Sequence, residues 1–302
     1  MDPKTAYEQV KTEFKKHIAG KEDTIELMFI TMIAQGHALL EGVPGVAKTT
    51  MSKTLAQTID ADFKRVQGTG DLEIRDIIGY TFLDEKNEVK FNKGPIFTNI
   101  LLIDELNRAP QKTMSSFLEA LEEKQVTAGG ENLELPKPFV AFATQNPLRI
   151  EGTEALPKVL SDRFLVRISV DYPSMIEEQQ MIRLKEREEH VDVKKIIGTA
   201  DIIAMQEASK SILISDSVVE YITKIVDATR KDIHIVMGAS PRADIAFMRA
   251  AKARALISGR NEANVDDIKF LAKPVLSHRL SVRSTGGIGV NGLIDGIIAT
   301  LG

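Results

Sequence analysis

The chain has 302 residues, of which 43% are hydrophobic and 27% charged, and its formal net charge is −4. This is the composition of a globular protein with a real core, and it gives no electrostatic case for a dedicated nucleic-acid binder. The absence of cysteine excludes disulfides, thiolate nucleophiles and cysteine-ligated zinc. No apolar run approaches a membrane span and the N-terminus lacks a signal-peptide core, so we expect a cytoplasmic protein.

The first predicted elements are two amphipathic helices, over residues 4–18 and about 22–35, in which apolar residues recur three and four positions apart. They precede a stretch with the sequence GVPGVAKTT at residues 42–50. This stretch follows a short apolar run and opens a predicted helix over 50–59. Strand, tight glycine loop, Lys-Thr and helix is the order found in phosphate-binding loops.

The residue types of this loop suit nucleotide phosphates. Its backbone N–H groups can converge on anionic oxygens, and the helix N-terminus adds its positive dipole end. Lys48 can place a charge on the β- and γ-phosphates, and the Thr49 hydroxyl can ligate Mg²⁺. The general motif has glycine where this chain has Ala47, so we expect Ala47 to keep a negative φ, as at a helix start. The predicted phosphate-binding residues are Gly42, Val43, Pro44, Gly45, Val46, Ala47, Lys48, Thr49 and Thr50.

Four further strands are predicted after the loop, at residues 62–67, 99–104, 139–144 and 164–169, with a helix over about 111–123. The runs at 99–104 and 139–144 are continuously apolar, which is typical of strands buried on both faces of a parallel sheet. Strands separated by helices predict a doubly wound α/β sheet, whose ligands bind beyond the carboxyl ends of the strands.

The sequence also contains two irregular segments and a boundary after which strand patterns give way to helical ones. Residues 71–98 indicate an insert with a hairpin that turns near Asn87, and residues 126–138 a second hairpin that turns at Gly129-Gly130. We place a domain boundary near residue 172, so that 1–172 form the α/β domain and 173–302 an all-helical domain. Its predicted helices cover 174–190, 191–210, 215–230, 241–259 and 264–279.

Two carboxylates lie at the end of the predicted strand 99–104, and an amide follows the predicted strand 139–144. Asp104 can hold the Mg²⁺ shell opposite Thr49, and Glu105 can orient and deprotonate an attacking water. Asn146 can sense the γ-phosphate or help position that water. The alternatives are a buried strand that ends in solvated acids and an ordinary Asn-Pro turn.

Two arginines follow in motifs that suit phosphoryl transfer. Arg163, in SDRF before the fifth strand, can project away from its own nucleotide towards a neighbouring subunit, and arginine fingers are known to act in trans. Arg242, in GASPRA, lies in the first turn of a predicted helix, against the dipole preference, which points to an anionic partner. The alternatives are a surface Asp-Arg pair and an exposed first-turn arginine.

The motifs GVPGVAKT, ILLIDE, ATQNP, SDRF and GASPRA, in this order, resemble those of MoxR-family AAA+ ATPases over essentially the whole chain. The resemblance implies that Lys48, Thr49, Asp104 and Glu105 are Walker residues. It also implies that Asn146 is sensor 1, Arg163 the arginine finger and Arg242 sensor 2. Residues 71–98 would contain the helix-2 insert and 126–138 the pre-sensor-1 hairpin. The segment that ends at Gly20 resembles the lining of the adenine pocket.

The same resemblance implies ATP and Mg²⁺ as cofactors and a chaperone-like role in a ring hexamer. Its partners would be further copies of the chain, a protein client and a von Willebrand factor A domain protein. One alternative is a DNA translocase or a magnesium-chelatase-type motor. The mixed charges of both hairpins disfavour gripping nucleic acid, so we expect no nucleic-acid partner. Another alternative is a nucleotide-gated scaffold without hydrolysis, which the presence of Glu105 and Arg163 disfavours.

Overall fold

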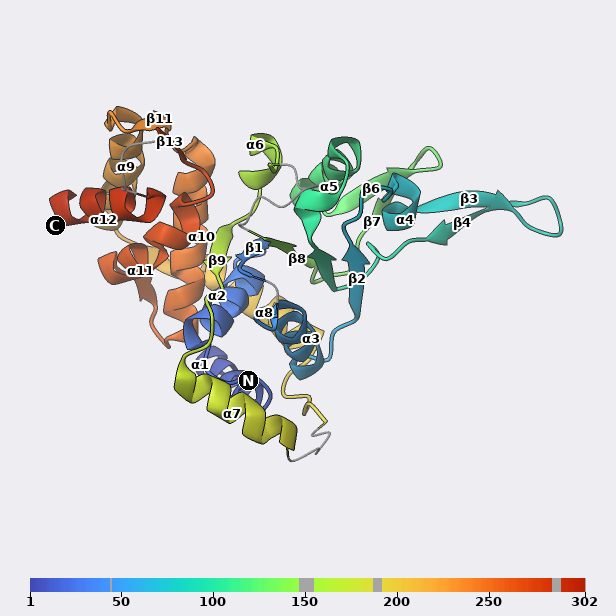
Figure 1. Cartoon of the computed structure of the whole chain (residues 1–302), viewed down its shortest axis with the longest axis horizontal. Coiled ribbons are helices and arrows are strands. Elements are labelled where there is room, and N and C mark those ends of the chain that lie inside the picture. Colours follow the sequence, from blue (N-terminus) through green and yellow to red (C-terminus); the bar gives the residue numbers. More distant parts are fainter. Residues whose placement is uncertain (44, 147–154, 187–191, 284–288, 302) are drawn as a thin grey trace.

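The fold is a five-stranded parallel sheet between helices, with a helical region on one side and a projecting hairpin on the other (Figure 1). The computed structural model describes residues 1–43, 45–146, 155–186, 192–283 and 289–301. The strands run in the order β2-β5-β8-β1-β9, and all four neighbouring pairs are parallel. Their bounds are β1 Ala38–Glu41, β2 Phe63–Gln67, β5 Ile100–Asp104, β8 Val140–Gln145 and β9 Val166–Ser169. The predicted doubly wound sheet is confirmed.

Alternate residues of β5 face two different hydrophobic cores, which explains why this strand is apolar throughout. Ile100 and Leu102 pack into the core formed with α1, α2 and α3, whereas Leu101 and Ile103 pack into the core formed with α5. These helices span α1 Pro3–Lys15, α2 Glu22–Ile33, α3 Lys48–Thr58 and α5 Gln111–Glu123. Two short helices, η1 Leu106–Arg108 and α6 Lys158–Ser161, lie at opposite ends of the parallel strands. Helix η1 follows the carboxyl end of β5, and α6 precedes the amino end of β9.

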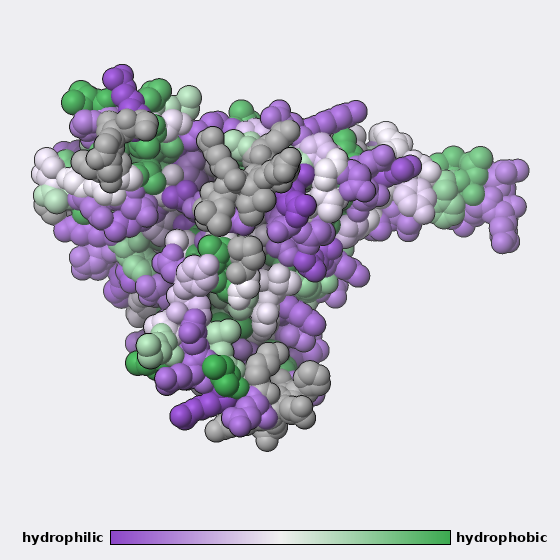
Figure 2. All heavy atoms as spheres, in the orientation of Figure 1, coloured by the Kyte–Doolittle hydropathy of each residue, from purple (hydrophilic) through white to green (hydrophobic). Residues whose placement is uncertain are grey.

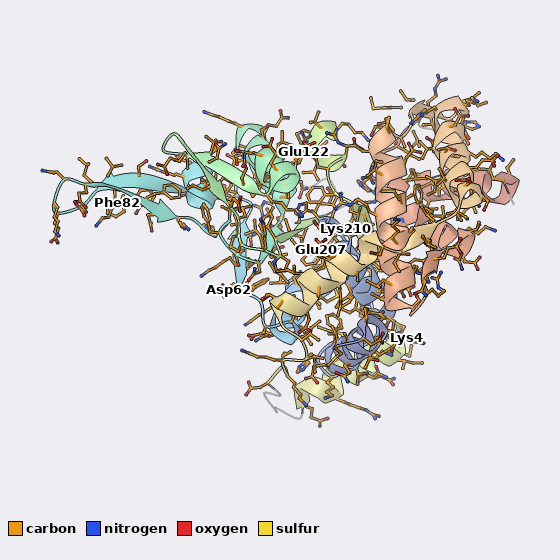
Figure 3. All side chains as sticks on the ribbon, turned by 180° about the vertical axis from the view of Figure 1, so that it is seen from behind. Lys4, Asp62, Phe82, Glu122, Glu207 and Lys210 are labelled. Carbon is orange, nitrogen blue, oxygen red and sulfur yellow. The ribbon has the colours of Figure 1, made fainter. Side chains whose placement is uncertain are left out.

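Both predicted hairpins are present. The insert forms α4 Ile74–Ile78, β3 Gly79–Leu83 and β4 Val89–Lys93, with Asn87 at its turn in a left-handed conformation. The second hairpin pairs β6 Gln125–Ala128 with β7 Glu131–Glu134 and turns at two glycines with positive φ. The arm of β3 and β4 carries Phe82 far from the sheet and from Glu122 (Figure 3).

The region after β9 is mostly helical, as predicted, but the helix expected over 191–210 begins only at Thr199, and two further differences occur. Its helices are α7 Met175–Glu186, α8 Thr199–Lys210, α9 Asp216–Lys231, α10 Pro241–Ile257, α11 Val265–Leu276 and α12 Val290–Leu301. Helix α12 was not predicted, because the sequence before residue 293 is rich in glycine. The region also contains two small sheets, which pair β10 Leu213–Ile214 with β12 Glu262–Ala263 and β11 Ile235–Met237 with β13 Ser281–Val282. The prediction of an all-helical region is therefore wrong in this detail.

The helical region packs against the N-terminal helices and not only against the sheet. The Gln206 side chain donates to the Met32 carbonyl at 2.9 Å, and Arg254 pairs with Glu26 at 2.8 Å. One hydrophobic core continues from α1 and α2 into α8, α10 and α11. Within the described ranges, no helix combines the length and the apolar character needed to cross a membrane.

Candidate active site

The predicted phosphate-binding loop joins the carboxyl end of β1 to α3. A Cβ atom on Gly42 would lie 2.3 Å from the Val170 carbonyl oxygen, so only glycine fits where the loop leaves the sheet. Gly45 has a φ of +87°, and no heavy atom lies within 4 Å of the position its Cβ would take. The loop therefore has the glycine geometry and the open space that a phosphate needs, whereas Pro44 lies outside the described residues.

Ala47 departs from the prediction. Its φ is +62°, in the left-handed region, and α3 begins at Lys48, two residues earlier than expected. The expectation of a negative φ is wrong because the loop turns into the helix at this residue and not before it. An alanine in this conformation carries a strain of about 1 kcal/mol.

Lys48 lies within the curve of the loop. Its Nζ donates to the carbonyl of Gly42 and, at 3.0 Å, to that of Val43. Burial lowers the pKa of Lys48, and the nearby carboxylates of Asp104, Glu105 and Glu41 oppose this effect. An anionic phosphate in the loop would compensate a cation that the protein has partly removed from water.

Asp104 connects the loop to the neighbouring strands. Its Oδ2 accepts from Thr49 Oγ1 at 3.3 Å and from two nitrogens of Arg65, at 2.6 and 3.1 Å. Its Oδ1 accepts from Thr144 Oγ1 at 2.6 Å. The oxygens of Thr49 and Asp104 fit Mg²⁺, which takes few protein ligands and completes its shell with water and phosphate. No cluster of three or more His, Cys, Asp or Glu side chains that could hold a metal occurs among the described residues.

Glu105 is held in a specific orientation next to this group. Its backbone is left-handed, with a φ of +53°, and its N–H donates to Thr144 Oγ1 at 2.8 Å. Its Oε2 accepts from Gln67 Nε2 at 3.1 Å and from Arg108 NH1 at 2.9 Å. Gly68 permits this approach, since a Cβ there would lie 2.2 Å from the Glu105 carbonyl oxygen. The carboxylate is thus positioned beyond the end of β5.

Sequence reasoning missed Thr144, Arg65 and Gln67. Thr144 belongs to the ATQNP motif, in which the sequence pattern pointed to the amide of Asn146. Arg65 and Gln67 alternate along β2, so they share one face of an edge strand next to β5. Polar residues two apart at the end of a strand were the available signal.

Asn146 and Gly20 also lie at this edge of the sheet. Asn146 directly follows β8, whose last residue, Gln145, donates to Glu41 Oε1 at 2.9 Å. Gly20 has a φ of +67°, and the next residue, Lys21, donates to the carbonyl of Asp171 at 2.9 Å. Because Val170 packs on Gly42, this contact places Gly20 close to the phosphate-binding loop.

Arg163 lies near the amino ends of the parallel strands, opposite the carboxyl ends that carry the phosphate-binding loop. It precedes β9, and the Leu165 N–H donates to the His37 carbonyl at 2.8 Å, at the start of β1. The loop that holds Lys48 follows the end of β1, and α6 and α3 are accordingly far apart in Figure 1. The structure therefore brings together Lys48, Thr49, Asp104 and Glu105, but not Arg163.

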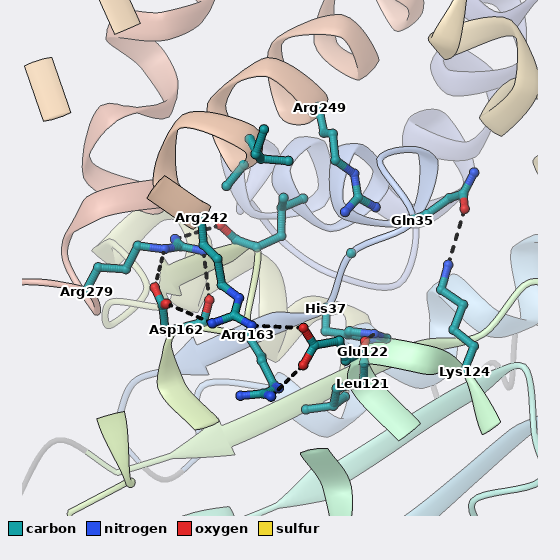
Figure 4. A pocket seen from close by; sticks show the side chains of 14 residues that line it. Gln35, His37, Leu121, Glu122, Lys124, Asp162, Arg163, Arg242, Arg249 and Arg279 are labelled. Atoms are coloured by element: carbon teal, nitrogen blue, oxygen red, sulfur yellow. Dashed lines mark hydrogen bonds and ion pairs between the residues drawn. The ribbon is translucent and has the colours of Figure 1, made fainter. Parts of the chain in front are cut away.

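Arg242 lies next to Arg163, and both contact one carboxylate (Figure 4). Glu122 Oε2 lies 2.5 Å from Arg163 NH2, and its Oε1 lies 2.9 Å from Arg242 NH2. The anionic partner expected for Arg242 therefore exists within the chain, and Ser240 caps α10 by accepting from the Arg242 N–H at 3.2 Å. The Arg163 side chain folds back onto Glu122 and is only 16% exposed, so in a single subunit it does not project outwards.

Comparisons with known proteins agree with this architecture. Residues 37–166 match the model of the AAA family, described as ATPases associated with various cellular activities, and residues 227–287 match the AAA lid domain. The chain is 38% identical to the chaperone MoxR1 of Mycobacterium tuberculosis over 89% of this chain and 74% of the relative. It is 42% identical to YeaC of Bacillus subtilis, over 87% and 83%. A crystal structure of a candidate ATPase from Cytophaga hutchinsonii superposes with a TM-score of 0.91 at 36% identity, over 98% and 94%.

Proposed function

The chain belongs to the MoxR family of AAA+ ATPases, and from this premise we propose that it hydrolyses ATP with Mg²⁺ at the interfaces of a ring and thereby remodels a protein client. The ATPase assignment rests on the family. The ring, the client and the roles of individual residues are our proposals. They are supported by the positions of the Walker residues and of the two arginines.

Within one subunit, the residues at the carboxyl edge of the sheet bind the nucleotide and prepare the water. Lys48 and the backbone N–H groups of the loop residues other than proline hold the phosphates, and Gly20 borders the adenine. Thr49 and Asp104 hold Mg²⁺, which supplies neutralising charge when bound. Glu105 accepts a proton from the attacking water, and Asn146 faces the γ-phosphate.

Arg163 and Arg242 complete the site of a neighbouring copy. This is the observation that carries the proposal, because both lie at the opposite edge of the sheet from Lys48. The four residues of β9 alone span about 10 Å, which supports the proposal that Arg163, and Arg242 beside it, serve a nucleotide other than that of their own subunit. We therefore assign both arginines to stabilising the charge on a phosphoryl group held by the next subunit.

The projecting hairpin supports a protein client. Tyr80, Phe82, Leu83 and Val89 are exposed on β3 and β4. Figure 2 shows this apolar surface on the arm, between the main body and a polar tip. Exposed apolar surface of this kind fits protein contact and not a phosphate backbone, which requires basic side chains. This favours a chaperone-like role over a DNA translocase, and a von Willebrand factor A domain protein is the proposed partner class.

The test is steady-state ATP hydrolysis against protein concentration, with mass determination in parallel, for the wild type and Glu105→Gln. We expect specific activity to rise as a larger species forms. The variant should bind ATP but hydrolyse it at least 100-fold more slowly, which is the usual scale for general-base loss. Hydrolysis that is independent of concentration would contradict the ring. Tight ATP binding without hydrolysis by the wild type would favour the scaffold.

A further inference from the structure

A cavity of about 320 Å³ lies where the end of α5, the start of β9, the turn before β1 and the first half of α10 meet (Figure 4). Its lining is strongly basic. Five cationic side chains and two carboxylates line it, namely Lys124, Arg163, Arg242, Arg249, Arg279, Glu122 and Asp162. The cavity therefore carries an excess of three positive charges.

The two carboxylates are already engaged on one side of the cavity. Glu122 pairs with Arg163 and Arg242, and Asp162 pairs with Arg279 at 3.1 Å. His37 supplies no further charge. Its Nε2 contacts the Leu121 carbonyl at 2.9 Å, its Nδ1 accepts from the Ala141 N–H, and burial lowers its pKa to about 3.

Lys124 and Arg249 lie on the other side, without an acidic partner among the described residues. Among the described residues, Lys124 Nζ bonds to the neutral Gln35 Oε1, at 3.3 Å, and Arg249 donates to the Ala34 carbonyl. Burial lowers the pKa of Arg249 and lowers that of Lys124 to about 8, with repulsion from Arg249 adding to the latter effect. Two partly buried cations without a counter-charge are costly for the folded state.

Two further details concern the cations that line the cavity. Lys124 ends α5 in a left-handed conformation with a φ of 56°, where glycine is the usual residue. Arg163, which also lines the cavity, has a buried Nε without a hydrogen-bond partner in the described part of the chain. Arg163 therefore keeps one guanidinium donor that no described residue accepts from.

We propose that Lys124 and Arg249 form a binding site for a phosphate group. Phosphate fits better than a carboxylate because it brings about −1.5 to −2 charges and three acceptor oxygens to an excess of positive charge. The phosphate can come from a free anion or from the nucleotide of a neighbouring copy. The site itself stands on one subunit, whereas its use by a neighbour rests on the proposed function.

The first test measures pyrophosphate binding by calorimetry in the Lys48→Ala background, where the phosphate-binding loop is disabled. We expect one saturable site per chain, and at least tenfold weaker binding after Lys124→Gln or Arg249→Gln. Lys252→Gln, on the same helix as Arg249 but bonded to the Lys210 carbonyl, is the control and should bind as before. No binding in the Lys48→Ala background, or unchanged binding after Arg249→Gln, would overturn the proposal.

A second readout separates binding from a structural role. Without anion, Arg249→Gln should keep or raise the melting temperature, because the substitution removes an unpaired buried charge. A large drop in melting temperature together with intact pyrophosphate binding would show a structural role for Arg249 and overturn the proposal. A further measurement identifies the source of the phosphate. The ATP affinity of Glu105→Gln protein is compared with that of the double variant that also carries Arg249→Gln, each at low and at high protein concentration. Weakening only at high concentration assigns the site to the neighbour's nucleotide. Equal affinities assign it to a free anion, and a protein that never assembles leaves the pyrophosphate test intact.

Discussion

Arg163 and Arg242, which come from different regions of the chain, bind the two oxygens of a single carboxylate, that of Glu122. Both arginines lower the pKa of Glu122, so this group stays ionised. A carboxylate that accepts from two guanidinium groups occupies the donors that a phosphoryl group would need. In the ring that we propose, Glu122 would therefore compete with the nucleotide of a neighbour for both arginines.

The first prediction concerns Glu122→Gln. The amide holds the arginines more weakly than the carboxylate, so we expect ATP hydrolysis at low protein concentration to rise several-fold and the half-activating concentration to fall. Glu123→Gln is the matched control, because Glu123 contacts Gln125 and neither arginine. A loss of activity as large as that of Arg163→Ala would show instead that Glu122 is required to position the arginines.

The second prediction concerns Gln67, which donates to the Glu105 carboxylate at 3.1 Å. Gln67→Ala removes one of the two side chains that orient the proposed general base. We expect kcat to fall about tenfold with KM within twofold, since small misplacements of reacting groups are costly. Lys64→Ala, on the same strand, should leave both constants unchanged. A change in KM alone would contradict the orienting role.

The third prediction concerns the backbone of the phosphate-binding loop. Ala47 has a φ of +62°, so Ala47→Gly should stabilise the protein by about 0.5–1 kcal/mol. Ala56→Gly, inside α3, should destabilise it by about 1 kcal/mol. Urea unfolding of both variants checks the pair. If both substitutions destabilise equally, Ala47 is not in a left-handed conformation in solution.

The fourth prediction concerns acid stability. Burial acts to raise the pKa of Glu13, but bonds from Lys16 at 2.7 Å, the Lys194 N–H at 3.0 Å and His17 at 3.3 Å lower it to about 2. Because the folded pKa lies below the ordinary value of 4.5, its contribution is complete above pH 4.5 and is lost towards pH 2.

Glu13→Gln checks this sign. We expect it to lower the free energy of unfolding by about 2 kcal/mol at pH 7, with the difference from wild type shrinking below pH 4.5. Glu8→Gln, on the exposed face of the same helix, should be neutral. A difference that stays constant from pH 7 to pH 3 would show that packing and not charge accounts for the effect.

The sequence predicts the sheet well because its strands are strongly patterned, and Asp104 and Thr49 meet as the rule for parallel sheets requires. Both hairpins follow from Asn87 and the pair Gly129-Gly130. Less local features were not predictable. Ala47 adopts a left-handed conformation that alanine rarely takes, and Thr144 acts through a contact made across neighbouring strands. That Glu122 joins Arg163 to Arg242 depends on how the helical region packs, which no local pattern encodes.

The most direct test of the account mixes two inactive proteins. Glu105→Gln lacks the proposed base but keeps Arg163, whereas Arg163→Ala lacks the arginine but keeps Glu105. Alone, each should bind ATP and hydrolyse it at a few per cent of the wild-type rate or less. An equal mixture should recover a substantial fraction of wild-type activity, because some interfaces then pair an intact Glu105 with an intact Arg163 from the next subunit. A mixture no more active than its components, although mixed rings form, would contradict a site shared between subunits.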